Sequence, residues 1–292
     1  MPAIVTMSDV RIDVGGFPAI DGMTLATTGD RVLVLGAARA LFEAAAGLRG
    51  IARGDLRVGG LGPLEAIRNG RAACAPLDPP LPPRWTAFQY VAWSARLAGH
   101  PRATARALAE DALGRLQLTS ISTVKLRRAE TVSRRGVVVA AALATGATTL
   151  LVEDPLGGLS DESARTFARA LSRAFQDRRT ALFAPRLPLQ SPLALHADEA
   201  LVVTGSQVAI QGAPAEIAAA ERSFSLRVHG DAEAFIHAVE LSGGRVVVTS
   251  SGALPREMRV DLGRLATRDL LRIANGMETT VLELRALARV FA

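Results

Sequence analysis

Apolar and polar positions alternate with a period of two over residues 3–14 (AIVTMSDVRIDV), which predicts an edge strand. Two glycines then favour a turn, and a second strand is expected near residues 22–26. The run RVLVLG at residues 31–36 is apolar after its first residue, as is typical of a buried strand. Strong helix formers follow directly and end at Gly47. The pattern therefore predicts a strand–turn–helix unit around residue 36.

The middle of the chain is predicted to mix helices with short buried strands. Five prolines within residues 71–84 predict an irregular loop. Helical spacing follows over 86–98 and 104–116, and residues 137–144 are apolar all round, which indicates a buried helix. The other expected elements are strands at 55–58, 149–152 and 180–184, a helix at 162–175, and a hairpin of 200–204 with 207–211.

The tail has a pattern of its own: strand, helix, strand, strand, helix, strand and a short terminal helix. These elements are expected at 224–228, 232–241, 245–249, 258–262, 267–274 and 279–284, with the short helix after them. This order is typical of a compact α+β unit. We therefore expect two domains, residues 1–222 and residues 223–292.

Composition narrows the class of protein. The 292 residues are 49% hydrophobic and 21% charged, which is typical of a globular chain. The single cysteine, Cys74, allows no internal disulfide and fits a reducing compartment. The longest apolar stretch, 137–152, is shorter than the ~20 residues needed to span a bilayer, and the N-terminus does not read as a signal peptide. These features predict a cytoplasmic protein.

The charge balance suggests no special partner. The formal net charge is +6, but the basic residues are spread along the chain and aromatic residues make up only 4%. Nucleic-acid-binding surfaces usually combine a basic patch with stacking aromatics, so no nucleic acid is expected. The four histidines are far apart in the sequence and have no ligand-like spacing, so no metal site is expected either.

The number of lysines in the chain has a direct chemical meaning. Of the 34 lysines and arginines, only Lys125 is a lysine. A phosphate-binding loop ends in Gly-Lys-Ser/Thr, because the lysine reaches the β- and γ-phosphates. Lys125 lies in STVKLRRAE, which has no glycine and no preceding apolar strand. Any phosphate loop in this chain must therefore lack its lysine.

The order of several segments resembles the ATP-binding subunit of ABC transporters over roughly residues 3–220. The strongest segments are TLLVEDPLGGLSDESA, which looks like the Walker B strand and D-loop, and LVVTGSQVAIQGAPAEI, which looks like the terminal hairpin. The resemblance implies an α/β fold: an ABC-type, P-loop-NTPase-like domain with a mixed sheet and a helical subdomain. The tail resembles the regulatory extension on ATPases of ABC-2-type exporters, which implies an ABC-2-type permease as partner.

The phosphate loop departs from the family pattern. The family runs Gly-x-x-Gly-x-Gly-Lys-Ser/Thr, whereas this chain runs Gly36-Ala37-Ala38-Arg39-Ala40, about four residues shorter. The lysine, the hydroxyl and two glycines are missing. Arg39 supplies a positive charge but does not replace the point charge of a lysine or the backbone cradle.

The signature and Walker B motifs depart as well. The signature Leu-Ser-Gly-Gly-Gln becomes Val132-Ser133-Arg134-Arg135-Gly136. Two interpretations of its arginines remain open: they contact a partner's phosphate across a dimer, or they form a relaxed, solvent-exposed basic turn. Walker B normally ends Asp-Glu, and here the carboxylates are exchanged as Glu153-Asp154.

The remaining nucleotide positions are also altered. Serine replaces the D-loop aspartate, arginine replaces the switch histidine, an aspartate lies near the Q-loop glutamine position, and a valine occupies the adenine-stacking position. These residues are Ser160, Arg186, Asp78 and Val14. Arginine has no accessible neutral form, so Arg186 cannot switch by protonation.

The resemblance together with these departures predicts a pseudo-ATPase subunit rather than an enzyme. It would pair with a second ATP-binding subunit, identical or different, and lie on the inner face of the membrane. Trp85 and Trp93 on one candidate helix are expected to pack in the core or an interface, and the resemblance implies permease docking as the alternative. ATP and Mg²⁺ would bind only if a partner completes the site. Two alternatives stay open: an ATPase that is active with a partner ATPase, and a soluble ABC-like protein associated with nucleic acid.

Overall fold

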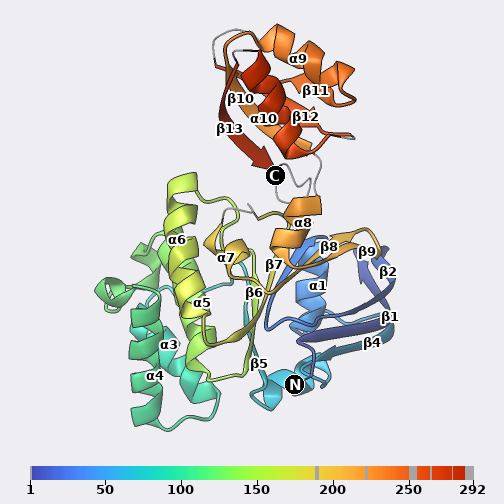
Figure 1. Ribbon diagram of the computed structural model, residues 1–292. Helices are drawn as coiled ribbons and strands as arrows, with labels where there is room; N and C mark the ends of the chain where they lie inside the picture. Colours follow the sequence, from blue (N-terminus) through green and yellow to red (C-terminus); the bar gives the residue numbers. More distant parts are fainter. Residues whose placement is uncertain are drawn as a thin grey trace. The chain divides into compact units, whose positions relative to one another are not determined.

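The computed structural model describes residues 2–187, 191–220, 223–249, 255–263, 265–277 and 279–286. The chain divides into two compact units, Met1–Pro214 and Ala215–Ala292 (Figure 1). Within the described residues, no helix combines the length and the apolar character needed to cross a bilayer. The domain boundary near residue 222 stays a prediction.

A six-stranded sheet forms the centre of the first unit. Its spatial order is β5-β6-β7-β3-β8-β9, in which all neighbours are parallel except the antiparallel pair β8 and β9. The strands are β3 (Arg31–Gly36), β5 (Ala72–Ala75), β6 (Thr149–Glu153), β7 (Arg179–Ala184), β8 (Glu199–Thr204) and β9 (Gln207–Gly212). The central strands are buried on both faces, which explains why they are nearly continuous apolar runs.

A smaller antiparallel sheet and one helix complete the core of this unit. The small sheet has the order β2-β1-β4 and consists of β1 (Val5–Val14), β2 (Phe17–Ala26) and β4 (Arg53–Val58). Helix α1 (Ala38–Ala45) packs against strands of both sheets. Its fully buried Phe42 meets Phe183 of β7 edge to face, with ring centroids 5.7 Å apart. The two sheets and α1 therefore share one hydrophobic core.

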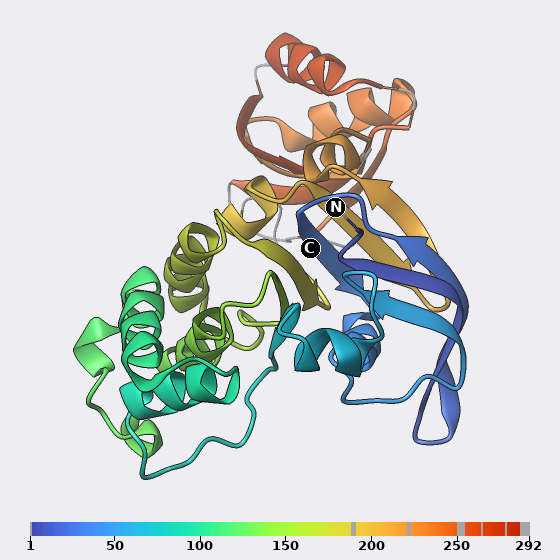
Figure 2. The same cartoon turned by 90° about the horizontal axis from the view of Figure 1, so that it is seen from below.

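Three helices form a separate layer, seen in green in Figure 2: α3 (Ala87–Leu97), α4 (Arg102–Arg115) and α5 (Thr131–Ala144). They pack on one another, and α5 also contacts β5 and β6. We call α3, α4 and α5 the helical layer. The other helices up to residue 220 are α2 (Pro63–Arg68), α6 (Asp161–Ala174), α7 (Pro192–Leu195) and α8 (Pro214–Ala220).

The second unit has the order strand, helix, strand, strand, helix, strand. Its elements are β10 (Ser223–His229), α9 (Ala232–Leu241), β11 (Arg245–Val248), β12 (Arg256–Asp261), α10 (Thr267–Gly276) and β13 (Thr280–Ala286). The four strands form an antiparallel sheet in the order β11-β12-β10-β13. Side chains of α9 and α10 share a core with the sheet, including the fully buried Phe235 and Leu270. The short terminal helix predicted from the sequence lies outside the described residues.

The predicted fold class is confirmed, while three local predictions are corrected. The irregular loop expected at 71–84 is wrong for residues 72–75, because they pair in parallel with β6 as strand β5. The buried helix expected at 137–144 begins six residues earlier, at Thr131. Trp85 lies before α3 rather than on it, because Thr86 caps the helix and forms a capping box with Gln89.

Candidate functional site

The turn between β3 and α1 is a single residue long. Gly36 ends the strand and Ala38 begins the helix, so only Ala37 lies between them. The φ angle of Gly36 is 93°, and a Cβ there would lie 2.1 Å from the carbonyl oxygen of Val203. The N–H groups of Gly36 and Ala37 donate to the carbonyls of Pro185 and Val203, each at 3.2 Å. These two donors are therefore already used within the chain.

Arg39, in the first turn of α1, pairs with carboxylates of its own chain. Its Nε lies 3.0 Å from Oε1 of Glu43 and 3.8 Å from Oε1 of Glu153. The Arg39 side chain is 80% exposed, whereas that of Glu153 is 11% exposed. Glu153 also accepts a hydrogen bond from the N–H of Leu77 at 2.9 Å. Arg39 thus lies close enough to attract the carboxylate at the end of β6.

The two adjacent carboxyl groups after β6 lie in a partly buried position. Burial raises the pKa of Glu153, and the nearby charges of Glu43 and Asp154 act in the same direction, against Arg39. Burial also raises the pKa of Asp154. The backbone of Asp154 has a φ of 31°, and a Cβ at Gly157 would lie 2.1 Å from Oδ2 of Asp154. This loop therefore requires glycine at 157 to accommodate the carboxylate.

Arg135 is buried, and its guanidinium binds two loops of the same chain. Its side chain is 9% exposed, and its Nε and Nη2 donate to the two carboxylate oxygens of Asp78 at 3.1 and 2.9 Å. Its Nη1 donates to the carbonyls of Pro155 at 3.3 Å and Gly157 at 2.5 Å. The interpretation of a solvent-exposed basic turn is wrong for Arg135. Only its neighbour Arg134 is exposed.

The rest of the signature segment lies inside α5. Because the helix begins at Thr131, residues 132–136 form its first turns, and Ser133 lies in the first of them. The side chain of Arg134 donates to the hydroxyl of Thr131, at 3.5 Å. Gly136 is buried, and a Cβ there would lie 2.7 Å from Cδ1 of Leu118. Glycine at 136 therefore permits close packing.

The last two predicted site residues lie in two further loops. Ser160 is the N-cap of α6 and accepts a hydrogen bond from the N–H of Ser163 at 3.4 Å. Arg186 is exposed and follows Pro185, whose carbonyl binds the N–H of Gly36. Four of the predicted site residues thus have partners within the chain: Gly36 bonds to Pro185, Arg39 pairs with Glu153, and Arg135 pairs with Asp78. Among the described residues, the side-chain hydrogen bonds of Arg134 and Ser160 stay within their own helices.

Two features were missed from the sequence. Phe17 lies at the tip of the β1–β2 hairpin, opposite Val14, and is 76% exposed. No alternation marks this position, because Phe17 and Pro18 are both exposed. The second is Asp78, which was noted only as a substituted glutamine position. Its pairing with Arg135 had no sequence signal, because 57 residues separate them.

A groove of about 490 Å³ lies on the helical layer. Its apolar lining includes Trp85 and Trp93, whose rings meet edge to face at 5.5 Å, and Phe88, which stacks under Arg106 at 5.3 Å. Trp93 is 45% exposed. The arginines on the groove are Arg84, Arg96, Arg102 and Arg106. None of these four forms an ion pair within the described ranges, so the groove combines an apolar lining with unpaired positive charge.

Several solved structures resemble the first unit. CbiO1 from Clostridium perfringens, part of the ABC transporter complex cbiONQ, is 18% identical and superposes with a TM-score of 0.63, covering 74% of this chain and 91% of CbiO1. The fold is that of an ATP-binding cassette. MJ1267, an ATP-binding cassette of an ABC transporter, gives a TM-score of 0.62 at 14% identity and covers 74% of this chain and 94% of MJ1267. No family model and no curated protein sequence matches the chain.

The residues at the start of α1 and the end of β6 do not fit a bound Mg²⁺–nucleotide. A triphosphate needs free backbone N–H groups at a helix start, a cation for its β/γ-phosphates and a hydroxyl for the metal. Here the donors of Gly36 and Ala37 bind carbonyl groups, Arg39 pairs with Glu153, and the first turn of α1 carries no hydroxyl. Within the described residues, no group of three or more His, Cys, Asp or Glu side chains is placed to hold a metal ion.

Proposed function

We propose that the chain is a pseudo-ATPase: a catalytically degenerate nucleotide-binding-domain subunit of an ABC-2-type membrane transporter complex, with a structural or regulatory role. The observation that carries this proposal is the one-residue turn at Ala37, whose N–H donates to Val203 instead of facing a phosphate. A phosphate cradle depends on several such donors pointing outward together. With the donors of Gly36 and Ala37 already bonded, this turn offers a phosphate fewer N–H groups than a phosphate loop does.

The partners follow from the same proposal. Structures with this fold are described as parts of ABC transporters, which supports a membrane permease as one partner. A second ATP-binding subunit, identical or different, would complete the pair on the inner face of the membrane. The ABC-2 assignment rests on the small α+β unit that follows the cassette.

Titration with Mg-ATP tests the proposal directly. We expect isothermal titration calorimetry of the full chain to give a Kd weaker than about 1 mM, equivalent to less than about 4 kcal/mol of binding free energy. The control is Asp154→Asn, which should leave this weak signal unchanged. Micromolar affinity, with ATP turnover that Asp154→Asn removes, would overturn the proposal. Binding that appears only when a second ATP-binding subunit is added would favour the partner-completed ATPase instead.

We also propose that the groove on the helical layer docks the permease. Its exposed Trp93 and its unpaired arginines suit an amphipathic helix that presents one apolar side chain between acidic ones. Buried tryptophans are frequent hot spots of protein interfaces, where truncation commonly costs about 2 kcal/mol or about 30-fold in affinity. Charge complementarity would come from carboxylates opposite Arg96 and its neighbours.

Variants of the groove provide the measurement. Trp93→Ala should weaken binding to a co-expressed candidate permease by about 30-fold. Arg96→Glu should also weaken this binding, and the loss should be larger at low salt than at high salt. The matched control is Arg169→Glu, a charge reversal at an exposed arginine of α6, outside the groove. Equal binding by the Trp93→Ala variant and the wild type would remove the groove from the interface.

A further inference from the structure

One buried arginine joins the helical layer to two loops of the sheet. Arg135 comes from α5, Asp78 follows β5, and Pro155 and Gly157 follow β6. Helix α5 also packs against β5 and β6. We call the four residues Arg135, Asp78, Pro155 and Gly157 the Arg135 clamp. All three nitrogens of the guanidinium donate within it.

The geometry of the clamp is that of a strong and directional interaction. Bidentate pairing of a guanidinium with a carboxylate fixes both distance and orientation. The bond to Asp78 is also the main cause of the lowered pKa of that carboxyl group. The attraction within a buried ion pair largely offsets the free energy that both groups lose when they leave water. A buried guanidinium that loses its partner keeps its charge without this compensation, so breaking the pair destabilises the fold. The clamp is therefore expected to stay closed at neutral pH.

The loops on the sheet side have backbone conformations that need such support. Asp78 has a φ of 45° and Asp154 a φ of 31°, both in the left-handed region that non-glycine residues rarely adopt. Residues in this region persist when surrounding contacts hold them there. Arg135 bonds to Asp78 directly and to the carbonyls of Pro155 and Gly157 in the turn after Asp154. One side chain thus stabilises both unusual turns.

Further contacts connect the clamp to the start of α1. The N–H of Leu77, next to Asp78, donates to Glu153, and Glu153 contacts Arg39 at the start of α1. The helical layer, the ends of β5 and β6 and the start of α1 are consequently linked by the chain's own charges. No nucleotide is needed to bridge them.

We propose that the side chain of Arg135 holds the helical layer against the six-stranded sheet in one fixed arrangement, an interaction that we call the lock. The proposal rests on the pseudo-ATPase assignment and states how the subunit is regulated: its helical layer is locked without nucleotide. Arg134, the adjacent but exposed arginine, acts on Asp78 only through its charge and donates no hydrogen bond to the clamp among the described residues. The two neighbours therefore form a matched pair for experiment.

Hydrogen–deuterium exchange of the full chain without nucleotide tests the lock. Its reporters are the amides of Leu77, Asp154 and Gly157, each of which donates a hydrogen bond next to the clamp. In Arg135→Gln we expect exchange in peptides 72–84 and 153–160 to rise at least tenfold, whereas in Asp78→Asn we expect this rise in peptide 72–84 alone, with the amides of β3 and β7 unchanged in both variants. Arg134→Gln should exchange like the wild type.

Three outcomes would overturn the lock: reporter exchange within twofold of the wild type in a peptide where a rise is expected, the same acceleration in Arg134→Gln, or uniform acceleration throughout the first unit. If Arg135→Gln fails to fold, Asp78→Asn decides alone, because it removes one carboxylate charge and leaves both carbonyl bonds in place. Tight Mg-ATP binding by the wild type would contradict the pseudo-ATPase proposal but not the lock. Unchanged exchange in the variants would contradict the lock but not the pseudo-ATPase proposal.

Discussion

Replacing Gly36 with alanine is expected to lower the free energy of unfolding of the first unit by about 3–5 kcal/mol. Two costs combine at this position. The left-handed backbone with a φ of 93° disfavours any Cβ, and this Cβ would lie 2.1 Å from the carbonyl oxygen of Val203. The oxygen belongs to the backbone of β8, so it moves only if the strand moves. Urea denaturation followed by circular dichroism measures the loss.

Gly16→Ala is the matched control for this prediction. Gly16 has a similar φ of 84°, but no heavy atom lies within 4 Å of the place that a Cβ would occupy. The control should therefore lose only the backbone term, about 1–2 kcal/mol. Similar losses for the two variants would show that the contact with Val203 does not constrain the turn.

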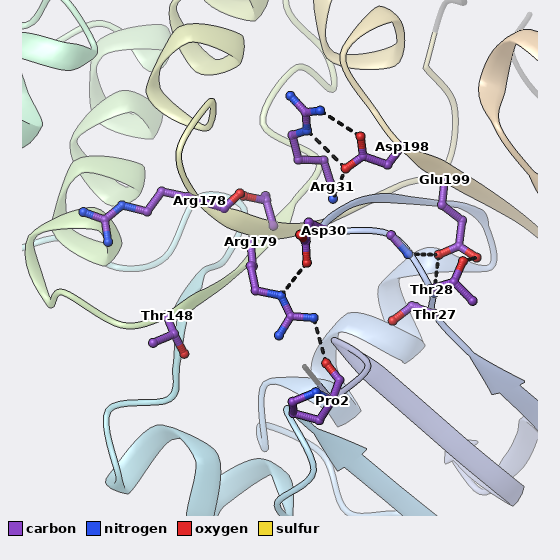
Figure 3. Close-up of polar contacts among 12 residues, drawn as sticks. Pro2, Thr27, Thr28, Asp30, Arg31, Thr148, Arg178, Arg179, Asp198 and Glu199 are labelled. Carbon is purple, nitrogen blue, oxygen red and sulfur yellow. Dashed lines mark hydrogen bonds and ion pairs between the residues drawn. The ribbon is translucent and has the colours of Figure 1, made fainter.

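The second large effect is expected at Glu199, whose carboxylate binds the segment of Thr28, as Figure 3 shows, and also Gln211 of β9. The side chain accepts from the N–H and hydroxyl of Thr28 at 2.7 and 2.9 Å, from the N–H of Gly29 at 2.9 Å and from Nε2 of Gln211 at 2.6 Å. The residue is 4% exposed. Glu199→Gln turns one acceptor into a donor among these donors, so we expect a loss of about 3 kcal/mol at pH 7.

The same carboxylate predicts a pH dependence. Burial alone would raise the pKa of Glu199, but the backbone donors and Gln211 outweigh it, and the net pKa is lowered. A lowered folded-state pKa stabilises the fold above the unfolded value of about 4.3, and this contribution disappears as the pH falls through the folded pKa. The difference between the wild type and Glu199→Gln should therefore shrink from pH 7 to about pH 3 in urea denaturation.

Asp198 offers the control for that experiment. It precedes Glu199 and binds Arg31 with Nη2–Oδ1 at 2.7 Å, but its side chain is 38% exposed (Figure 3). Exposed ion pairs contribute about 0–1 kcal/mol, so Asp198→Asn should have little effect. A difference between the wild type and Glu199→Gln that stayed constant with pH would contradict an ionised acceptor at this position.

Much of the scaffold could be predicted because its signals are local. The continuous apolar run of β3, the helix formers of α1 and the alternating pattern of the tail each mark an element within a few residues. Strand β5 escaped prediction because its four residues carry mostly alanine, and only the free edge of β6 makes them a strand. The polar first turn of α5 was missed because a helix start with Arg134 and Arg135 has no acidic or capping signal.

The site was only partly predictable for a related reason. The shortened loop at Gly36 and the exchange at Glu153 are visible in the order of residues alone. The burial of Arg135 is not visible in the order of residues, because it depends on which loops the tertiary structure brings next to the side chain. Arg39 was partly predictable. Its positive charge was evident from the sequence, but its pairing with Glu153 was not, because Glu153 lies 114 residues away in the chain.

The one-residue turn at Ala37 has a consequence for any attempt to install activity by design. Changing Arg39 to lysine would restore the missing residue type but leave the backbone path unaltered, with Gly36 still hydrogen-bonded to Pro185. An insertion of about four residues between strand and helix is required before a triphosphate can be surrounded by amides. Under the pseudo-ATPase proposal, the length of the turn between β3 and α1 therefore matters before its side chains do.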